Sequence, residues 1–91
     1  MNLKDLATEA AGYLEPLQSV RRDIHRHPEL GLETPKTLDR VMASISELPI
    51  EIERSDAGPT GPMTSALVRI TGGRPGPTVL LRADLDGLAL Q

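Results

Sequence analysis

The sequence predicts an α/β fold in which two N-terminal helices precede three strands. Three observations point to this fold class. Apolar residues recur at helical spacing through the first half of the chain. Residues 50–54 alternate apolar and polar side chains, and residues 79–81 form an unbroken apolar run, as an exposed and a buried strand do respectively.

The first helix is expected between Leu3 and His27. Asn2 is a plausible N-cap, and Pro28 disfavours helical dihedrals in the residue before it. Pro16 removes one backbone donor, so the sequence predicts either a kink there or two helices in near succession, with Pro16 in the first turn of the second. Apolar residues three and four positions apart form the buried stripe: Leu3, Leu6, Ala7, Ala10, Leu14, Leu17, Val20 and Ile24.

The second helix is expected from Thr34, as N-cap, and Pro35, as first helical residue, up to Leu48 before Pro49. Residues 50–54 then read as a strand at or near a sheet edge. Residues 55–63 contain two glycines and two prolines, which predicts a loop.

Two further strands complete the predicted fold. Residues 64–71 form the second, with Ala66, Val68 and Ile70 on one face, and a glycine- and proline-rich turn follows. Residues 78–83 form the third, which we expect to be covered on both faces and therefore central in its sheet. A central strand needs a neighbour on each side, so we expect the 91 residues to be the opening third or quarter of a larger domain.

Charge and composition exclude several classes of function. The net charge is −3, with acidic and basic residues interleaved, so no basic stripe is available for nucleic acid. Cysteine is absent, which excludes disulfides and thiolate metal sites within these 91 residues. The N-terminus resembles neither a signal peptide nor a membrane span, so we expect a cytoplasmic protein with no membrane partner.

The candidate chemistry lies at the end of the third predicted strand. Asp84 and Asp86 follow it directly, where open α/β sheets place their ligand sites. Such carboxylates either coordinate a hard cation or orient a metal-bound histidine, although aspartates also end strands simply by forming turns. Arg82, at the end of an apolar strand, needs a partner, and Asp84 or Asp86 is the candidate.

A second polar cluster has a simpler interpretation. His25 and His27 lie two positions apart, roughly 200° around a helix, so they do not converge on one ion. We expect a polar helix end whose basic side chains interact with the C-terminal dipole. Residues 21–23, Arg-Arg-Asp, are expected on a solvated face.

Two segments together point to a family. Residues 21–31 read Arg-Arg-Asp-Ile-His-Arg-His-Pro-Glu-Leu-Gly, and residues 76–86 read Gly-Pro-Thr-Val-Leu-Leu-Arg-Ala-Asp-Leu-Asp. Their order and spacing resemble the N-terminus of the metal-dependent N-acyl-amino-acid amidohydrolases, which include hippurate hydrolase, bacterial aminoacylases and the plant auxin-conjugate hydrolases. The resemblance spans nearly the whole chain.

The resemblance implies that residues 1–91 are the N-terminal part of a mixed-sheet metallopeptidase catalytic domain, without the smaller lid or dimerisation domain. In that family two divalent ions (zinc, manganese, cobalt or nickel) activate a water for attack on the amide, with a glutamate as general base. The implied substrate is a small N-acyl amino acid or amide, and a homodimer is left open.

The resemblance also assigns site residues. Asp86 matches an aspartate that orients a metal ligand from behind, and Arg82 and Asp84 shape the site. Asp84 stands where the wider superfamily has a metal-binding histidine, and no residue of this chain is assigned as a metal ligand. Gly87 and Ala89 depart from the alanine and proline usual in the subgroup. We expect the isolated chain neither to bind two metals tightly nor to hydrolyse amides.

Two alternatives stay open at this point. One is a non-catalytic α/β interaction module or remnant, whose exposed third strand pairs with another chain. The other is a fragment of a nucleotide-sugar glycosyltransferase that holds a divalent cation with Asp-x-Asp. Such enzymes begin with a nucleotide-binding unit that opens on a strand, whereas this sequence opens with helices.

Overall fold

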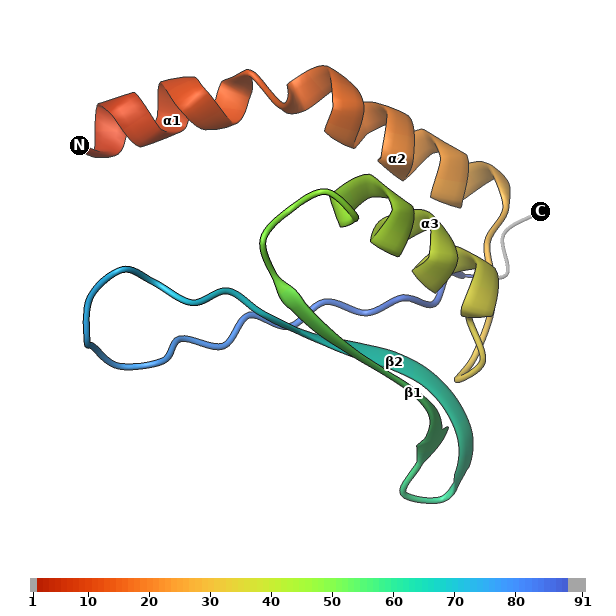
Figure 1. Cartoon of the computed structure of the whole chain (residues 1–91). Helices are drawn as coiled ribbons and strands as arrows, with labels where there is room; N and C mark the ends of the chain where they lie inside the picture. Colours follow the sequence, from red (N-terminus) through yellow and green to blue (C-terminus); the bar gives the residue numbers. More distant parts are fainter. Residues whose placement is uncertain (1, 89–91) are drawn as a thin grey trace.

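The computed structural model describes residues 2–88, and Ala89 lies outside them. Over this range helices precede a strand hairpin, which confirms the α/β class and the order of the elements. The hairpin packs on α3 through β2, and α2 packs on α3 as well (Figure 1). The elements are α1 Leu3–Ala11, α2 Leu14–Arg26, α3 Pro35–Ile45, β1 Glu51–Gly58 and β2 Gly61–Arg69.

The first predicted helix is two helices in succession, the second of the two expected alternatives. α1 ends at Ala11, and α2 begins at Leu14 with Pro16 in its first turn. Pro16 removes no hydrogen bond of α2 at this position, because the first-turn amides have no partner inside the helix. Asn2 caps α1 as expected, since its Oδ1 accepts a hydrogen bond from the Asp5 amide at 2.9 Å. α2 ends at Arg26, just before His27.

α3 begins at Pro35 as predicted, but its end and its cap differ from expectation. Thr34 occupies the N-cap position without a side-chain capping bond. The helix stops at Ile45 rather than Leu48. Near this end, the hydroxyls of Ser44 and Ser46 donate hydrogen bonds to the carbonyls three residues back. Such local bonds compete with continuation of the helix.

The two strands form an antiparallel hairpin that is longer than predicted. Ile52 pairs with Val68 in its register, and a bulge lies between Ser55 and Ala57. The prediction of a loop at 55–63 is wrong, because β1 continues to Gly58 and β2 starts at Gly61. The glycines flank a two-residue turn, and Gly61 has φ +148°, which favours glycine. The glycines and prolines of residues 55–63 therefore lie at the ends of the two strands and in the short turn between them.

The third predicted strand is not formed. Residues 78–83 have no assigned strand, and Val79, Leu80 and Leu81 are 82%, 78% and 91% exposed. The physical reason is the lack of a neighbour: a strand is defined by hydrogen bonds to adjacent strands, and the sheet of the described residues contains only β1 and β2. The apolar run is present, but nothing in residues 2–88 covers it on both faces.

The core of the described chain is small. Leu38 is its one buried apolar side chain, at 2% exposure, beside buried Thr34 and Thr37. The accessible surface is 8192 Å², whereas a compact protein of this mass exposes about 5,200 Å². The radius of gyration is 15.5 Å, against about 12 Å for a compact domain of this length. Much apolar surface is therefore left open.

Within residues 2–88, no helix has both the length and the apolar character that crossing a membrane requires.

Candidate active-site wall

The three predicted site residues lie along one groove. Arg82, Asp84 and Asp86 line a hollow of about 660 Å³ between the extended 79–86 segment and the surface formed by β2 and α3. The opposite wall is mostly apolar and includes Leu38, Val41, Met42, Met63, Ala66 and Val68. Two carboxylates and a guanidinium thus face an apolar surface across an open groove.

Arg82 and Asp84 form the ion pair that the sequence predicted. The Arg82 Nη2 donates to Asp84 Oδ1 at 3.1 Å. The pair does not form because of burial, as had been expected, since the side chains of Arg82 and Asp84 are 85% and 70% exposed. A pair exposed to this degree contributes at most about 1 kcal/mol to folding. Its importance is the shape and charge that it gives to the groove.

The turn after Asp86 is attached to the loop before α3. The Gly87 amide donates to the Glu29 carbonyl at 2.8 Å. In the same loop, the Leu32 carbonyl accepts from the Thr64 amide of β2 at 2.7 Å. The two segments that carry the family resemblance therefore meet in space. Sequence reasoning missed this contact, because no spacing pattern relates residues so far apart.

Glu29 also caps α3 with its side chain. Its Oε1 accepts from the Thr37 amide at 2.5 Å, which satisfies one of the free donors in the first turn. Partial burial by itself would raise the pKa of Glu29. Hydrogen bonds from Thr37 and from the Lys36 amide, with the Lys36 charge, outweigh it and hold the pKa below its ordinary value of 4.5. The carboxylate is therefore the form that fits this position.

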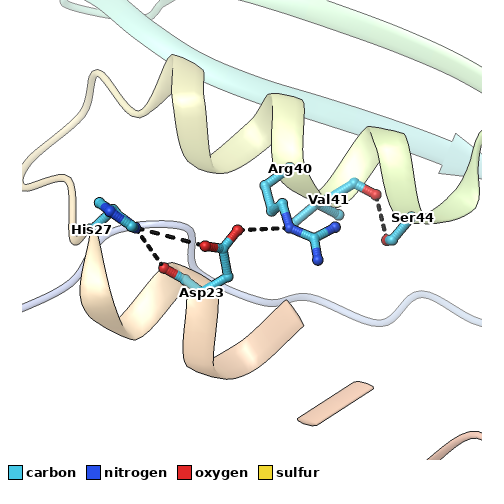
Figure 2. A network of polar contacts seen from close by, with 5 residues as sticks. All are labelled: Asp23, His27, Arg40, Val41 and Ser44. Carbon is cyan, nitrogen blue, oxygen red and sulfur yellow. Dashed lines mark hydrogen bonds and ion pairs between the residues drawn. The ribbon is translucent and has the colours of Figure 1, made fainter. Parts of the chain in front are cut away.

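Asp23 connects α2 to α3 (Figure 2). Its Oδ2 accepts from Arg40 Nε at 2.7 Å, and both side chains are about one-third exposed. The expectation of a merely solvated face at 21–23 is thus wrong for Asp23. Like the Glu29 cap, this pairing depends on the path of the chain between the two helices, so no local pattern in the sequence predicts it.

The two histidines lie at the end of α2, where the sequence predicted a polar helix end, and their interaction with the helix dipole stays a prediction. His25 lies in the last turn of α2, and His27 follows the helix, where its Nδ1 lies 3.1 Å from the Asp23 carbonyl (Figure 2). Since a carbonyl only accepts, this contact requires the proton on Nδ1. The hollow beside it, about 640 Å³, is lined by both helices and includes Asp23, His27 and Glu29.

The described residues do not by themselves fit a metal ion. Across residues 2–88, no three histidine, aspartate or glutamate side chains gather closely enough to hold one. Asp84 is engaged by Arg82. The divalent ions implied by the family resemblance thus find no complete ligand set among residues 2–88.

Comparison with known proteins gives relatives of one kind. The chain is 35% identical over 88 residues to the Bacillus subtilis protein YhaA, which has a provisional name as an amidohydrolase. It is 38% identical over 80 residues to an N-acetyldiaminopimelate deacetylase of Oenococcus oeni. It is also 38% identical over 72 residues to thermostable carboxypeptidase 2 of Saccharolobus solfataricus. These matches cover 97%, 85% and 79% of the chain.

The same matches span only about a fifth of each relative, at 21%, 20% and 17% of its length. No family model matches the chain. No solved structure matches it either. Because the relatives are named amidohydrolase, deacetylase and carboxypeptidase, the resemblance that the two motifs indicated is confirmed: the chain corresponds to a part of hydrolases of this kind.

Proposed function

We propose that this chain, a relative of amidohydrolases and deacetylases over most of its length, supplies one wall of the active site of an amide-bond hydrolase. Its substrates would be N-acyl amino acids or similar small amides. The observation that supports this most is the convergence of Arg82, Asp84 and Asp86 on one groove, at the end of the segment that resembles the family. The names of the relatives supply the reaction class.

The charge of this wall favours a cation or a hydrogen-bond donor over an anion. Two carboxylates face one guanidinium, and that guanidinium is already paired with Asp84 at 3.1 Å. Asp86 makes no side-chain hydrogen bond or ion pair within residues 2–88 and lies on the same groove, so it is the group available to orient a further side chain. The carboxylate of an amino-acid substrate therefore needs a positive group from outside this chain.

This chain would supply only part of the catalytic site. In the family that it resembles, divalent metal ions supply an activated water. The ligands and the general base for that chemistry would come from residues beyond the 91 of this chain, because residues 2–88 assemble no ligand set. Asp86 would hydrogen-bond one such ligand, and Arg82 and Asp84 would shape the entrance beside it.

A non-catalytic interaction module is the second candidate, and the exposed apolar run Val79–Leu81 favours it. Such a run is suited to pairing with another chain. The glycosyltransferase alternative has no such support, since α1, α2 and α3 all precede the first strand.

A chimera tests the proposal. The 80 matching residues of the Oenococcus oeni deacetylase are replaced by this chain, and release of acetate from N-acetyldiaminopimelate is measured. We expect a chimera with native-like circular dichroism to turn over substrate. The isolated chain, incubated with zinc or manganese and the same substrate, should show no turnover above a metal-only blank.

Two results would contradict the proposal. A folded chimera without activity would mean that this chain cannot serve as part of the hydrolase site. Turnover by the isolated chain would mean that hydrolysis does not need ligands or a general base from other residues.

A further inference from the structure

Glu29 makes two contacts at once, one with its backbone and one with its side chain. Its carbonyl accepts the Gly87 amide at 2.8 Å, and its Oε1 accepts the Thr37 amide at 2.5 Å. The first contact belongs to the turn that follows Asp86, and the second to the first turn of α3. One residue thus joins the end of the acidic segment to the helix that forms the opposite side of the groove.

The packing at Gly87 tightens this connection. A Cβ placed at Gly87 would lie 2.9 Å from the Cβ of Pro28 and 3.8 Å from the Glu29 carbonyl oxygen. The first distance is shorter than real side chains tolerate, so a larger residue would push the turn away from the loop. A larger residue at position 87 would therefore require a shift of the turn relative to Pro28.

We propose that Glu29 is a positioning residue, which fixes Asp84 and Asp86 relative to α3 by holding the Gly87 turn and the α3 N-terminus together. This inference deepens the proposed function and rests on it for its relevance to hydrolysis. Without the side-chain contact, the Pro28–Glu29 end of the loop is no longer held against the first turn of α3. The Glu29 carbonyl then moves with the loop, and the acidic turn loses its fixed place beside the groove.

The alternative to a positioning role is a helix cap that has no effect on the acidic turn. The two are distinguished by amides that report separately on each contact. The Gly87 amide reports on the turn, and the Thr37 amide reports on the cap. The Thr64 amide, which donates to Leu32 at 2.7 Å, reports on the opposite end of the same loop.

The experiment is amide hydrogen exchange, followed by NMR on the full 91-residue chain, with Glu29→Ala and Glu29→Gln variants. In Glu29→Ala we expect exchange at Thr37 and at Gly87 to accelerate together, by about five- to tenfold, with little change at Thr64. Glu29→Gln keeps an acceptor oxygen at the same place and should restore both rates. Unchanged exchange at Gly87 in Glu29→Ala, or no rescue by glutamine, would overturn the inference.

A second variant tests the contact between the Gly87 turn and the Pro28–Glu29 loop by a change in the turn. Gly87→Ala introduces the Cβ that meets Pro28, and it should accelerate exchange of the amide at position 87, which donates to the Glu29 carbonyl, without affecting Thr37. Gly73→Ala is the matched control, because a Cβ there meets nothing within 4 Å. Equal exchange in these two variants would contradict the close packing. None of these readouts requires turnover, so they stand apart from the chimera that tests the proposed function.

Discussion

Gly31 lies in the left-handed region at φ +75°, between the Glu29 cap and the start of α3. No other residue type adopts this conformation without cost, so the glycine of the His-Pro-Glu-Leu-Gly segment has a backbone role. It turns the chain so that Glu29 can reach back to α3. The side chains on either side of it could not be placed without that turn.

Substitution of Gly31 tests this role. We expect Gly31→Ala to lower the free energy of unfolding by about 1–2 kcal/mol, because alanine is strained at this φ. Gly73→Ala is the control, since its Cβ enters open space. Urea denaturation followed by circular dichroism measures both, and equal midpoints for the two variants would contradict the backbone role.

The Asp23–Arg40 pair gives a second test at the residue scale. Asp23→Ala removes the contact between α2 and α3, and we expect a loss of about 0.5–1 kcal/mol in the free energy of unfolding, since both partners are partly shielded. Asp39→Ala removes the more exposed pair with Arg54 and should cost less. A larger effect in Asp39→Ala would mean that Asp23 does not join the helices.

Residue contacts were predictable only where they are local. The Arg82–Asp84 pair spans two positions and was expected, whereas the Asp23–Arg40 pair spans seventeen and was not. The Glu29 cap was missed for the same kind of reason. A threonine stood at the N-cap position, and the structure instead uses a carboxylate from farther back along the chain, which a local capping rule does not consider.

At the scale of the elements, the starts of the helices were predictable. Asn2, Pro16 and Pro35 predicted helix starts correctly because each acts on its own backbone. The strands were harder, since their extent depends on pairing between distant residues. β1 and β2 both ran past the predicted loop boundary, and the 78–83 segment, without a neighbour, formed no strand.

The α3 cap makes the stability of this helix depend on pH. Because the pKa of Glu29 is lowered in the folded chain, its contribution is present above the ordinary glutamate range and is lost as pH falls through the lowered value. We expect urea denaturation to give a lower free energy of unfolding at about pH 3 than at about pH 7.

Glu29→Gln is the matched variant for this pH dependence, because it keeps the acceptor and removes the titration. The difference in unfolding free energy between the two pH values should be smaller in this variant than in the wild-type chain. An identical difference in both proteins would exclude Glu29 as a source of the pH dependence.

At the scale of the whole molecule, the exposed surface is the main feature. The accessible area of 8192 Å² is far above the roughly 5,200 Å² of a compact protein of this mass. The groove between β2 and the 79–86 segment is lined by apolar side chains on both sides. A surface of this kind is unstable in water unless further protein covers it.

Self-association of the isolated chain tests this conclusion. We expect size-exclusion chromatography to give an apparent mass above the 9.8 kDa of the monomer. Leu81→Lys, which places a charge at a 91% exposed groove residue, should shift the chain toward monomer. Leu88→Lys, at an exposed position outside the groove, should not. A wild-type chain that elutes as a well-behaved monomer would contradict the open groove.

The most direct measurement of the central claim is the turnover of the chimeric deacetylase with Asp86→Asn. If Asp86 orients a metal-binding side chain, its replacement should lower kcat by about 10- to 100-fold. Asp56→Asn, an exposed aspartate on β1 that does not line the groove, should leave kcat unchanged. Equal kcat values for the two variants would contradict the assignment of Asp86 to the active-site wall.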